Sequence, residues 1–123
     1  MNDAITNFLS YLTDTKNYSL HTVTAYESDI RDFVSFYERF TASTLFVRDM
    51  ANIDTICFRS YLADAQRRGL SAKSVARSLS SLRSFYKFLT KKYNINNEAI
   101  GLISSPKTPR KISKAIDLAI SGW

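Results

Sequence analysis

Helix-breaking residues and thiols are scarce in this sequence. Its 123 residues include three glycines, two prolines and one cysteine. With so few glycines and prolines, little interrupts long helical segments. The lone thiol, Cys57, excludes an internal disulfide and fits a reducing compartment, so we expect a cytoplasmic protein.

Long apolar runs and export signals are also missing. No run approaches the length of a membrane span. The N-terminus lacks the basic, apolar and small-residue pattern of a cleaved signal. We therefore expect no membrane partner.

Residues suited to catalysis or metal binding are few. The one histidine, His21, falls in a different predicted helix from Cys57, and no orienting partner is visible. Cys57 lies between Ile56 and Phe58 in a helical pattern, which is typical of a small buried residue. We predict no catalytic residue, no metal site and no cofactor in this chain.

Apolar residues recur every three or four positions in four segments, which predicts four helices. Asp3 is expected to cap the first helix, which ends near Asp14. Ser19 is expected to cap the second, which runs from Leu20 to about Glu38. The predicted core residues are Ile5, Phe8, Leu9 and Leu12 in the first helix and Val23, Tyr26, Ile30, Phe33 and Tyr37 in the second.

The third and fourth predicted helices are separated by a glycine. Asn52 or Asp54 begins the third, and Gly69 ends it in the left-handed conformation. The fourth starts after Ser71 and ends around Lys92. Their predicted core residues are Ile56, Tyr61, Leu62 and Ala65 in the third and Val75, Leu79, Leu82, Tyr86 and Leu89 in the fourth. Strand-like alternation is weak and no Asn-Gly or Asp-Gly turn occurs, so we predict an all-α bundle of four helices.

Acidic and basic residues are unevenly divided along the chain. Residues 1–65 contain five Lys/Arg against nine Asp/Glu, whereas residues 66–123 contain twelve against two. A polyanionic partner would release counterions on binding the basic half. We expect the acidic half to face away from such a partner or toward another protein.

The fourth predicted helix carries a polar face that contains no acid, since no Asp or Glu occurs between Gly69 and Glu98. Cations and small hydroxyls together suit DNA phosphates, because the hydroxyls let the backbone approach closely. On such a solvated face, replacing Arg77 or Lys73 with Ala should leave the fold intact. The residues predicted opposite the core or at its flanks are Lys73, Ser74, Arg77, Ser80, Ser81, Arg83, Ser84 and Lys87.

Simpler interpretations of these residues stay open at this point. The basic face also fits an ordinary solvated surface of a bundle helix. Arg83 also suits a salt bridge to an acid such as Asp29 or Asp64. Tyr26 suits core packing, with or without a hydroxyl that reaches a phosphate.

The composition changes after residue 98. The segment 104–114, SSPKTPRKISK, contains both prolines and no acid, so a continuous helix cannot pass through it. We predict an extended basic linker over residues 99–114, in which Lys107, Arg110 and Lys111 contact DNA. Residues 1–98 then form the DNA-binding domain, and residues 115–123 look like the truncated start of a further domain.

Three segments follow patterns of a known family, in order. They are SLHTVTAYESDIRDF (19–33), GLSAKSVARSLSSLRSFYKFL (69–89) and SPKTPRKISK (105–114). They match a Ser-x-x-Thr-x-x-x-Tyr helix, a Gly-Leu-Ser-x-x-Ser helix with Leu-Arg-x-Phe-Tyr, and a Pro-Lys-x-Pro linker. Together they resemble the N-terminal core-binding domain of bacterial tyrosine recombinases of the Xer type, in the phage integrase family. The chain departs from the pattern at residues 112–114, where the family often has another proline.

The resemblance implies a SAM-like orthogonal four-helix bundle that closes one side of a C-shaped clamp around a recombination half-site, in chromosome dimer resolution. In this family the second and fourth helices face the major groove of double-stranded DNA. The first helix contacts a neighbouring protomer of a tetrameric synapse, while the isolated chain is expected to be monomeric. Carried onto this sequence, the DNA-contacting residues are Ser19, His21, Thr22, Tyr26, Lys73, Ser74, Arg77, Ser81, Arg83 and Lys87.

The resemblance also concerns catalysis. Family members cleave DNA with a tyrosine nucleophile, assisted by Arg, Lys and His of a C-terminal domain. None of the seven tyrosines here matches the nucleophile motif, so we expect a DNA-binding module without activity of its own. A phage or transposon integrase and a protein-interaction bundle with an acidic partner remain alternatives. Because no arm-binding segment precedes Asn2, we favour the Xer type.

Overall fold

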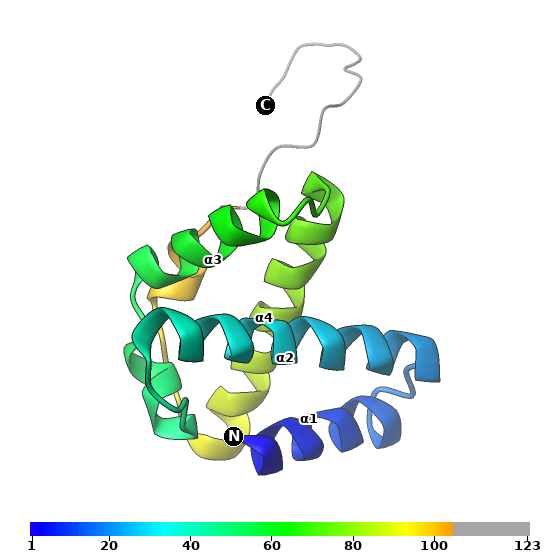
Figure 1. Cartoon of the computed structure of the whole chain (residues 1–123). Helices are drawn as coiled ribbons and strands as arrows, with labels where there is room; N and C mark the ends of the chain where they lie inside the picture. Colours follow the sequence, from blue (N-terminus) through cyan, green and yellow to red (C-terminus); the bar gives the residue numbers. More distant parts are fainter. Residues whose placement is uncertain (105–123) are drawn as a thin grey trace, which may run out of the picture.

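The computed structural model describes residues 1–104, and all regular structure in them is helical (Figure 1). The predicted all-α fold is confirmed, because four main helices pack together and no strand occurs in the described residues. The elements are α1 (Asn2–Asp14), α2 (Leu20–Thr41), the 3₁₀ helix η1 (Val47–Asn52), α3 (Thr55–Arg67), α4 (Ala72–Tyr93) and the 3₁₀ helix η2 (Ala99–Leu102).

Several predictions fall on residues 105–123, which lie outside the described residues. They are the extended linker beyond residue 104, the helix start over 115–123, and the DNA contacts assigned to Lys107, Arg110 and Lys111.

Three of the four helices begin with a side-chain cap at a predicted helix start. The side chains of Ser19, Asp54 and Ser71 each accept a hydrogen bond from the backbone N–H three residues further on. Such a bond satisfies one of the N–H groups that a helix start leaves without a partner. Gly69 lies just past the end of α3 with φ of +95°, as predicted, since glycine adopts this left-handed conformation without steric cost.

The ends of the first two helices differ from the prediction. Met1 precedes α1 and provides no side-chain cap, so the predicted cap at Asp3 is wrong. Asp3 lies inside the first turn, where its negative charge interacts favourably with the positive end of the helix dipole. α2 continues past Glu38 to Thr41.

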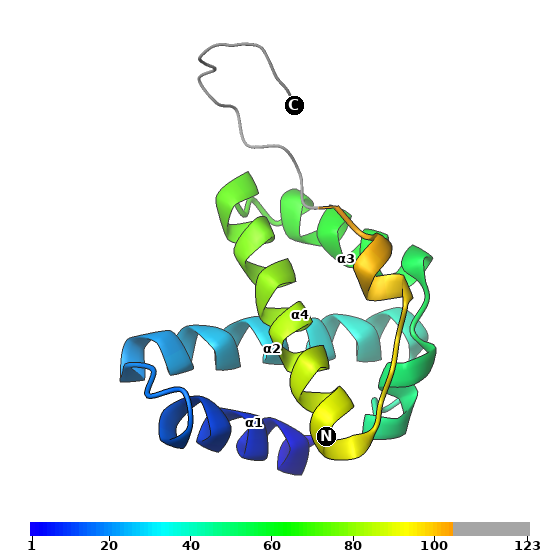
Figure 2. The same cartoon turned by 180° about the vertical axis from the view of Figure 1, so that it is seen from behind.

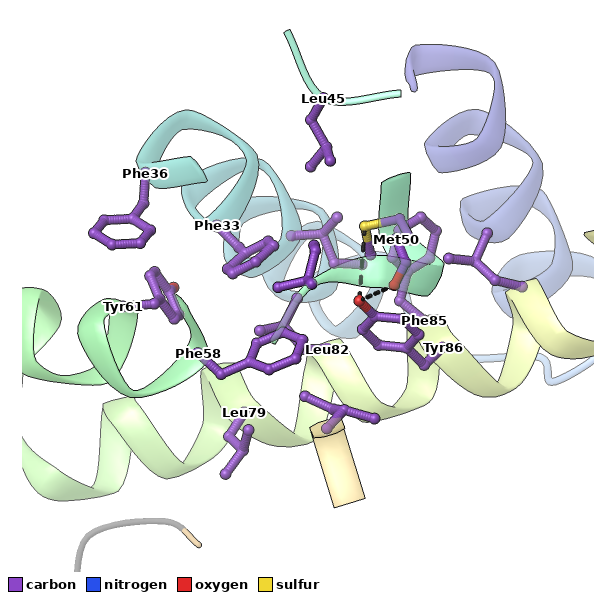
Figure 3. Close-up of a cluster of buried hydrophobic side chains, with 14 of the residues drawn as sticks. Phe33, Phe36, Leu45, Met50, Phe58, Tyr61, Leu79, Leu82, Phe85 and Tyr86 are labelled. Atoms are coloured by element: carbon purple, nitrogen blue, oxygen red, sulfur yellow. Dashed lines mark hydrogen bonds between the residues drawn. The ribbon is translucent and has the colours of Figure 1, made fainter. Parts of the chain in front are cut away.

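One hydrophobic core fills the space between the helices (Figure 3). Phe33 of α2 stacks on Phe58 of α3 and meets the edge of Tyr61, with ring centroids 5.7 and 5.2 Å apart. The predicted core residues of α4 are all buried, which confirms that side of the helix: Val75, Leu79, Leu82, Tyr86 and Leu89.

Tyr61, Leu62 and Ala65 of α3 are buried as predicted, but one predicted core residue of this helix faces solvent. Ile56 is 66% exposed, whereas Cys57 and Phe58, the next two residues, are buried. The prediction of an inward Ile56 is therefore wrong, and that of a buried Cys57 is confirmed.

A buried polar link joins η1 to α4. The Tyr86 hydroxyl donates to the Met50 carbonyl oxygen at 2.8 Å (Figure 3), and the Asn97 side-chain amide donates to the same oxygen at 2.8 Å. Burial raises the pKa of Tyr86 well above its usual value, so the hydroxyl remains a protonated donor. These two bonds matter because a buried carbonyl oxygen without a hydrogen-bond donor would destabilise the fold.

α4 crosses α2, and its two ends reach α3 and α1, as the two opposite views show (Figures 1 and 2). η2 follows α4 and packs against α3. Its Ile100 and the following Ile103 are buried in the common core. Residues 99–103 therefore belong to the packed bundle, although the sequence placed them in the linker.

The buried side of α4 provides a stability test. Leu82 is 1% exposed, and Leu82→Ala should lower the free energy of unfolding by about 2–5 kcal/mol, because it removes apolar contacts and leaves a cavity. Ser80→Ala, on the exposed side of the same helix, should change it by less than about 0.5 kcal/mol. Urea unfolding followed by circular dichroism measures both. Equal stability of the two variants would contradict the assignment of the core face.

Candidate nucleic-acid interface

Cations and serines follow one line along the solvent side of α4, at alternating steps of four and three residues. Six residues form this basic stripe: Lys73, Arg77, Ser80, Ser84, Lys87 and Lys91. At 1.5 Å per residue the stripe is about 27 Å long. No Asp or Glu occurs in α4, so nothing on the helix itself neutralises the stripe.

Arg77 is held by a buried acid of α2. Its Nε and Nη2 atoms donate to the two carboxylate oxygens of Asp29 at 3.1 and 2.8 Å. The hydroxyls of Ser78 and Ser81 donate to the same carboxylate at 3.3 and 2.7 Å. Asp29 is only 4% exposed, so these bonds from α4 replace the water that its charge has lost.

The pair with Asp29 changes what Arg77 contributes to the stripe. The hydrogen bonds to Asp29, followed by its charge, raise the pKa of Arg77 further above its usual value. The Arg77 side chain nevertheless stays 57% exposed, and its Nη1 atom donates no bond within the described residues. Arg77 can therefore still donate outward, but replacing it with Ala removes the charged partner of a buried carboxylate. The premise that Arg77 lies on a merely solvated face is wrong, and we expect Arg77→Ala to destabilise the bundle.

Ser81 does not belong to the exposed face. It is 4% exposed, and its hydroxyl is used by Asp29. Its placement opposite the core is wrong because α4 packs on its neighbours over more than one apolar stripe. Ser78 of the same turn is also buried against Asp29, at 2% exposure. Ser81 is therefore not available as a DNA contact in this structure.

Arg83 is partly buried and reaches the end of the packed chain. Its Nη2 atom donates to the carbonyl oxygen of Ile103. The alternative of a salt bridge from Arg83 to Asp29 or Asp64 is wrong, since those acids bind other arginines. Asp64 binds Arg67 at 3.4 Å and Arg68 at 2.9 Å.

Acidic and basic halves of the sequence are not separated in space. Asp32 of α2 accepts hydrogen bonds from Arg68 at 2.9 and 3.1 Å and from the Tyr61 hydroxyl at 2.8 Å. With the Asp29 and Asp64 pairs, three arginines of the basic half are thus bound to acids of the other half. The charges of the two halves therefore partly neutralise each other inside the bundle, while the expectation that the acidic half faces away from a polyanionic partner stays a prediction. In the described part of the chain, the lysines of the stripe take no part in such ion pairs.

The predicted contacts near the start of α2 are arranged around its cap. Ser19 and Thr22 are exposed, with their hydroxyl oxygens 3.1 Å apart, and His21 is exposed beside them. Tyr26 is partly buried and its ring stacks on that of Tyr18, with centroids 5.9 Å apart.

Tyr26 and Lys87 are brought together in a groove between the α1–α2 connection and the C-terminal half of α4. We call it the α1–α4 groove, and its volume is about 580 Å³. Lys73 and Ser74 do not line it, since they lie near the other end of α4. The groove includes residues that sequence reasoning missed as candidate contacts: Lys16, Tyr18 and Lys91. The sequence could have identified Lys91 as a candidate contact, because it lies four residues after Lys87 in the stripe.

No described residue combination resembles an active site. Burial, followed by the charge of Asp54, raises the pKa of the Cys57 thiol to about 11, which makes it a poor nucleophile. Burial and the bond to Asp32 raise the pKa of Tyr61 well above its usual value. Residues 1–104 contain no cluster of His, Cys, Asp and Glu suited to a metal. Within the same range no helix is both long and apolar enough to cross a membrane.

The class of protein follows from a match of the bundle to a known family. Residues 5–93 match the family of phage integrase N-terminal SAM-like domains, and the chain belongs to this family, as a core-binding domain of the tyrosine recombinase and integrase proteins. No solved structure matches the chain.

Three similar curated proteins are each named tyrosine recombinase XerC. The chain is 33% identical over 116 residues to the tyrosine recombinase XerC of Rickettsia typhi and 34% identical over 116 residues to that of Rickettsia prowazekii, covering 94% of this chain and 38% of each relative. It is 32% identical over 122 residues to XerC of Rickettsia canadensis, covering 97% of this chain and 40% of the relative. The chain thus spans about two fifths of the length of the relatives it matches.

The Arg77–Asp29 pair can be tested by a double-mutant cycle. Arg77→Ala should lower the free energy of unfolding by about 1–3 kcal/mol, because the buried carboxylate loses its charged partner. Asp29→Ala should also destabilise, and the double variant should lose clearly less than the sum of the two. Urea unfolding measures all three, with Lys73→Ala as the exposed control expected to change stability by less than about 0.5 kcal/mol. Additive losses would show that the pair is not coupled.

Proposed function

We propose that the chain binds duplex DNA at a recombination half-site, as the core-binding domain of a Xer-type tyrosine recombinase that acts in chromosome dimer resolution. The observation that carries this proposal is the basic stripe. It combines lysines that form no ion pair in the described residues with small hydroxyls, and α4 contains no acid. The family membership supports the same function.

The stripe suits a phosphate strand for physical reasons. Lys73, Lys87 and Lys91 are exposed point charges that release counterions when they neutralise phosphates. Ser80 and Ser84 have short side chains, which let the helix backbone approach DNA closely and donate neutral hydrogen bonds. A single α-helix also fits the major groove, which is about 12 Å wide.

The start of α2 supplies a second group of donors in this proposal. Ser19, His21 and Thr22 are exposed there, and the Tyr26 hydroxyl belongs to a partly buried ring beside α4. Lys73, Ser74, Arg77, Arg83 and Lys87 complete the proposed contact set on α4. Arg77 takes part through its free Nη1 atom. Arg83 takes part through its positive charge, because the Ile103 carbonyl to which it donates carries no net charge.

The remaining parts of the reaction are assigned to the rest of a longer protein. DNA cleavage by a tyrosine nucleophile would be carried out by a catalytic domain, and α1 would contact a neighbouring protomer in a tetrameric synapse. The isolated chain would be monomeric. The name XerC of the relatives supports a Xer protein over a phage or transposon integrase.

The proposed interface predicts a steep salt dependence of DNA binding. The affinity for a duplex should fall linearly with salt on a double-logarithmic plot, and Lys73→Gln should flatten the slope by about one unit through loss of a phosphate contact. Arg39→Gln, an exposed cation near the far end of α2, should not. Fluorescence anisotropy measures the slopes.

A salt-independent affinity, or equal effects of the two variants, would refute the interface. Binding of an acidic polypeptide in place of DNA would favour the protein-interaction alternative.

A second expectation concerns the division of labour. Incubation of this chain with a nicked suicide half-site should give no covalent protein–DNA adduct, because its buried tyrosines are protonated and no described group activates a nucleophile. Denaturing gel electrophoresis detects such adducts. An adduct that survives denaturation would contradict the proposed division.

A further inference from the structure

The α1–α4 groove concentrates positive charge without any acid to balance it. Lys16 lies on the α1–α2 connection, and Lys87 and Lys91 lie on the last turns of α4. No Asp or Glu lines the groove. None of the three lysines joins an ion pair within the described part of the chain.

The walls of the groove strengthen the attraction for an anion. Phe8, Leu12 and Phe88, which are almost fully buried, line the groove together with the three exposed lysines. A cleft with such low-dielectric walls and one sign of charge focuses the field and raises the local concentration of counterions. The mutual repulsion of three lysines is relieved when a negatively charged group enters.

The aromatic rings of the groove are already packed on one another. Tyr26 stacks on Tyr18 and meets the edge of Phe8, with both centroid distances 5.9 Å. Phe88 packs against Phe8 at 5.4 Å and against Tyr11 at the same distance. Except for Tyr18, which is 36% exposed, rings packed in this way offer little free face for stacking an unpaired base. The tyrosine hydroxyls and the lysines can act as donors, which suits a phosphate better than a base.

We infer that the α1–α4 groove holds the sugar-phosphate backbone of one strand of duplex DNA. Lys16 and Lys91 contact phosphates beside Lys87, and the Tyr18 hydroxyl donates a further hydrogen bond. The inference rests on the proposed function and extends the contact surface from α2 and α4 to the α1–α2 connection. It predicts that the strand passes from the basic stripe into the groove at Lys87.

Neighbouring lysines provide a matched test. Lys16→Gln and Lys91→Gln should each flatten the salt slope of duplex binding by about one unit. Lys92 is the next residue after Lys91 but does not line the groove, so Lys92→Gln removes the same charge and should leave the slope unchanged. Circular dichroism of each variant confirms that the fold is retained. Fluorescence anisotropy with one duplex at several salt concentrations gives the slopes.

Lysine footprinting tests the inference on the unmodified chain. Duplex DNA should protect the amines of Lys16 and Lys91 from acetylation, measured by mass spectrometry, and should protect Lys92 much less. A single strand of the same length serves as a second probe and should bind less tightly than the duplex. Tighter binding of the single strand would overturn the inference in favour of a site for unpaired DNA.

The outcomes separate this inference from the proposed function. If Lys73→Gln flattens the slope while Lys16→Gln, outside the stripe, behaves as Lys92→Gln does, the groove does not hold the strand but the stripe still binds DNA. If the unmodified chain shows no salt-dependent binding of duplex DNA, the proposed function fails, and the inference with it.

Discussion

The carboxylate of Asp29 is buried where α2 crosses α4, and the placement of the basic stripe depends on how its charge is satisfied. An isolated buried carboxylate is costly, but here Arg77, Ser78 and Ser81 all donate to it. These donors come from little more than one turn of α4, so a shift of α4 along α2 would break several bonds at once. The crossing thereby fixes which side of α4 is exposed, and it also brings the later part of α4 to Tyr26 at the groove.

Sequence periodicity predicted the helices well because their signals are local. Caps at Ser19, Asp54 and Ser71 and the stop at Gly69 depend on residues within a single turn. Ser81 was misplaced because periodicity reports only the strongest apolar stripe, whereas α4 packs on α2 through a polar cluster as well. A signal was present, since Asp29 falls between the stripe residues Tyr26 and Phe33 of α2, where an acid requires a partner.

Charge counting along the sequence did not show which cations of the basic half stay free of ion pairs. Arg67, Arg68 and Arg77 add to the sequence total, yet each is bound to an acid of α2 or α3 in the structure. The charge left without an ion pair in the described stripe belongs to lysines, which are compact ions without the planar fork of arginine. Such ions suit a phosphate strand in any sequence, so in the proposed function this face would mainly position the domain on DNA.

The bond from Arg83 to the Ile103 carbonyl oxygen has a mechanical consequence. It joins the middle of α4 to the last buried residue before Ser104, while Ile100 and Ile103 pack into the core on the same side. The chain therefore leaves the bundle from an anchored point that cannot swing independently of α4. The attachment point of any domain beyond it would be fixed relative to α4. The distance that such a domain could span would therefore be set from the helix that carries the basic stripe.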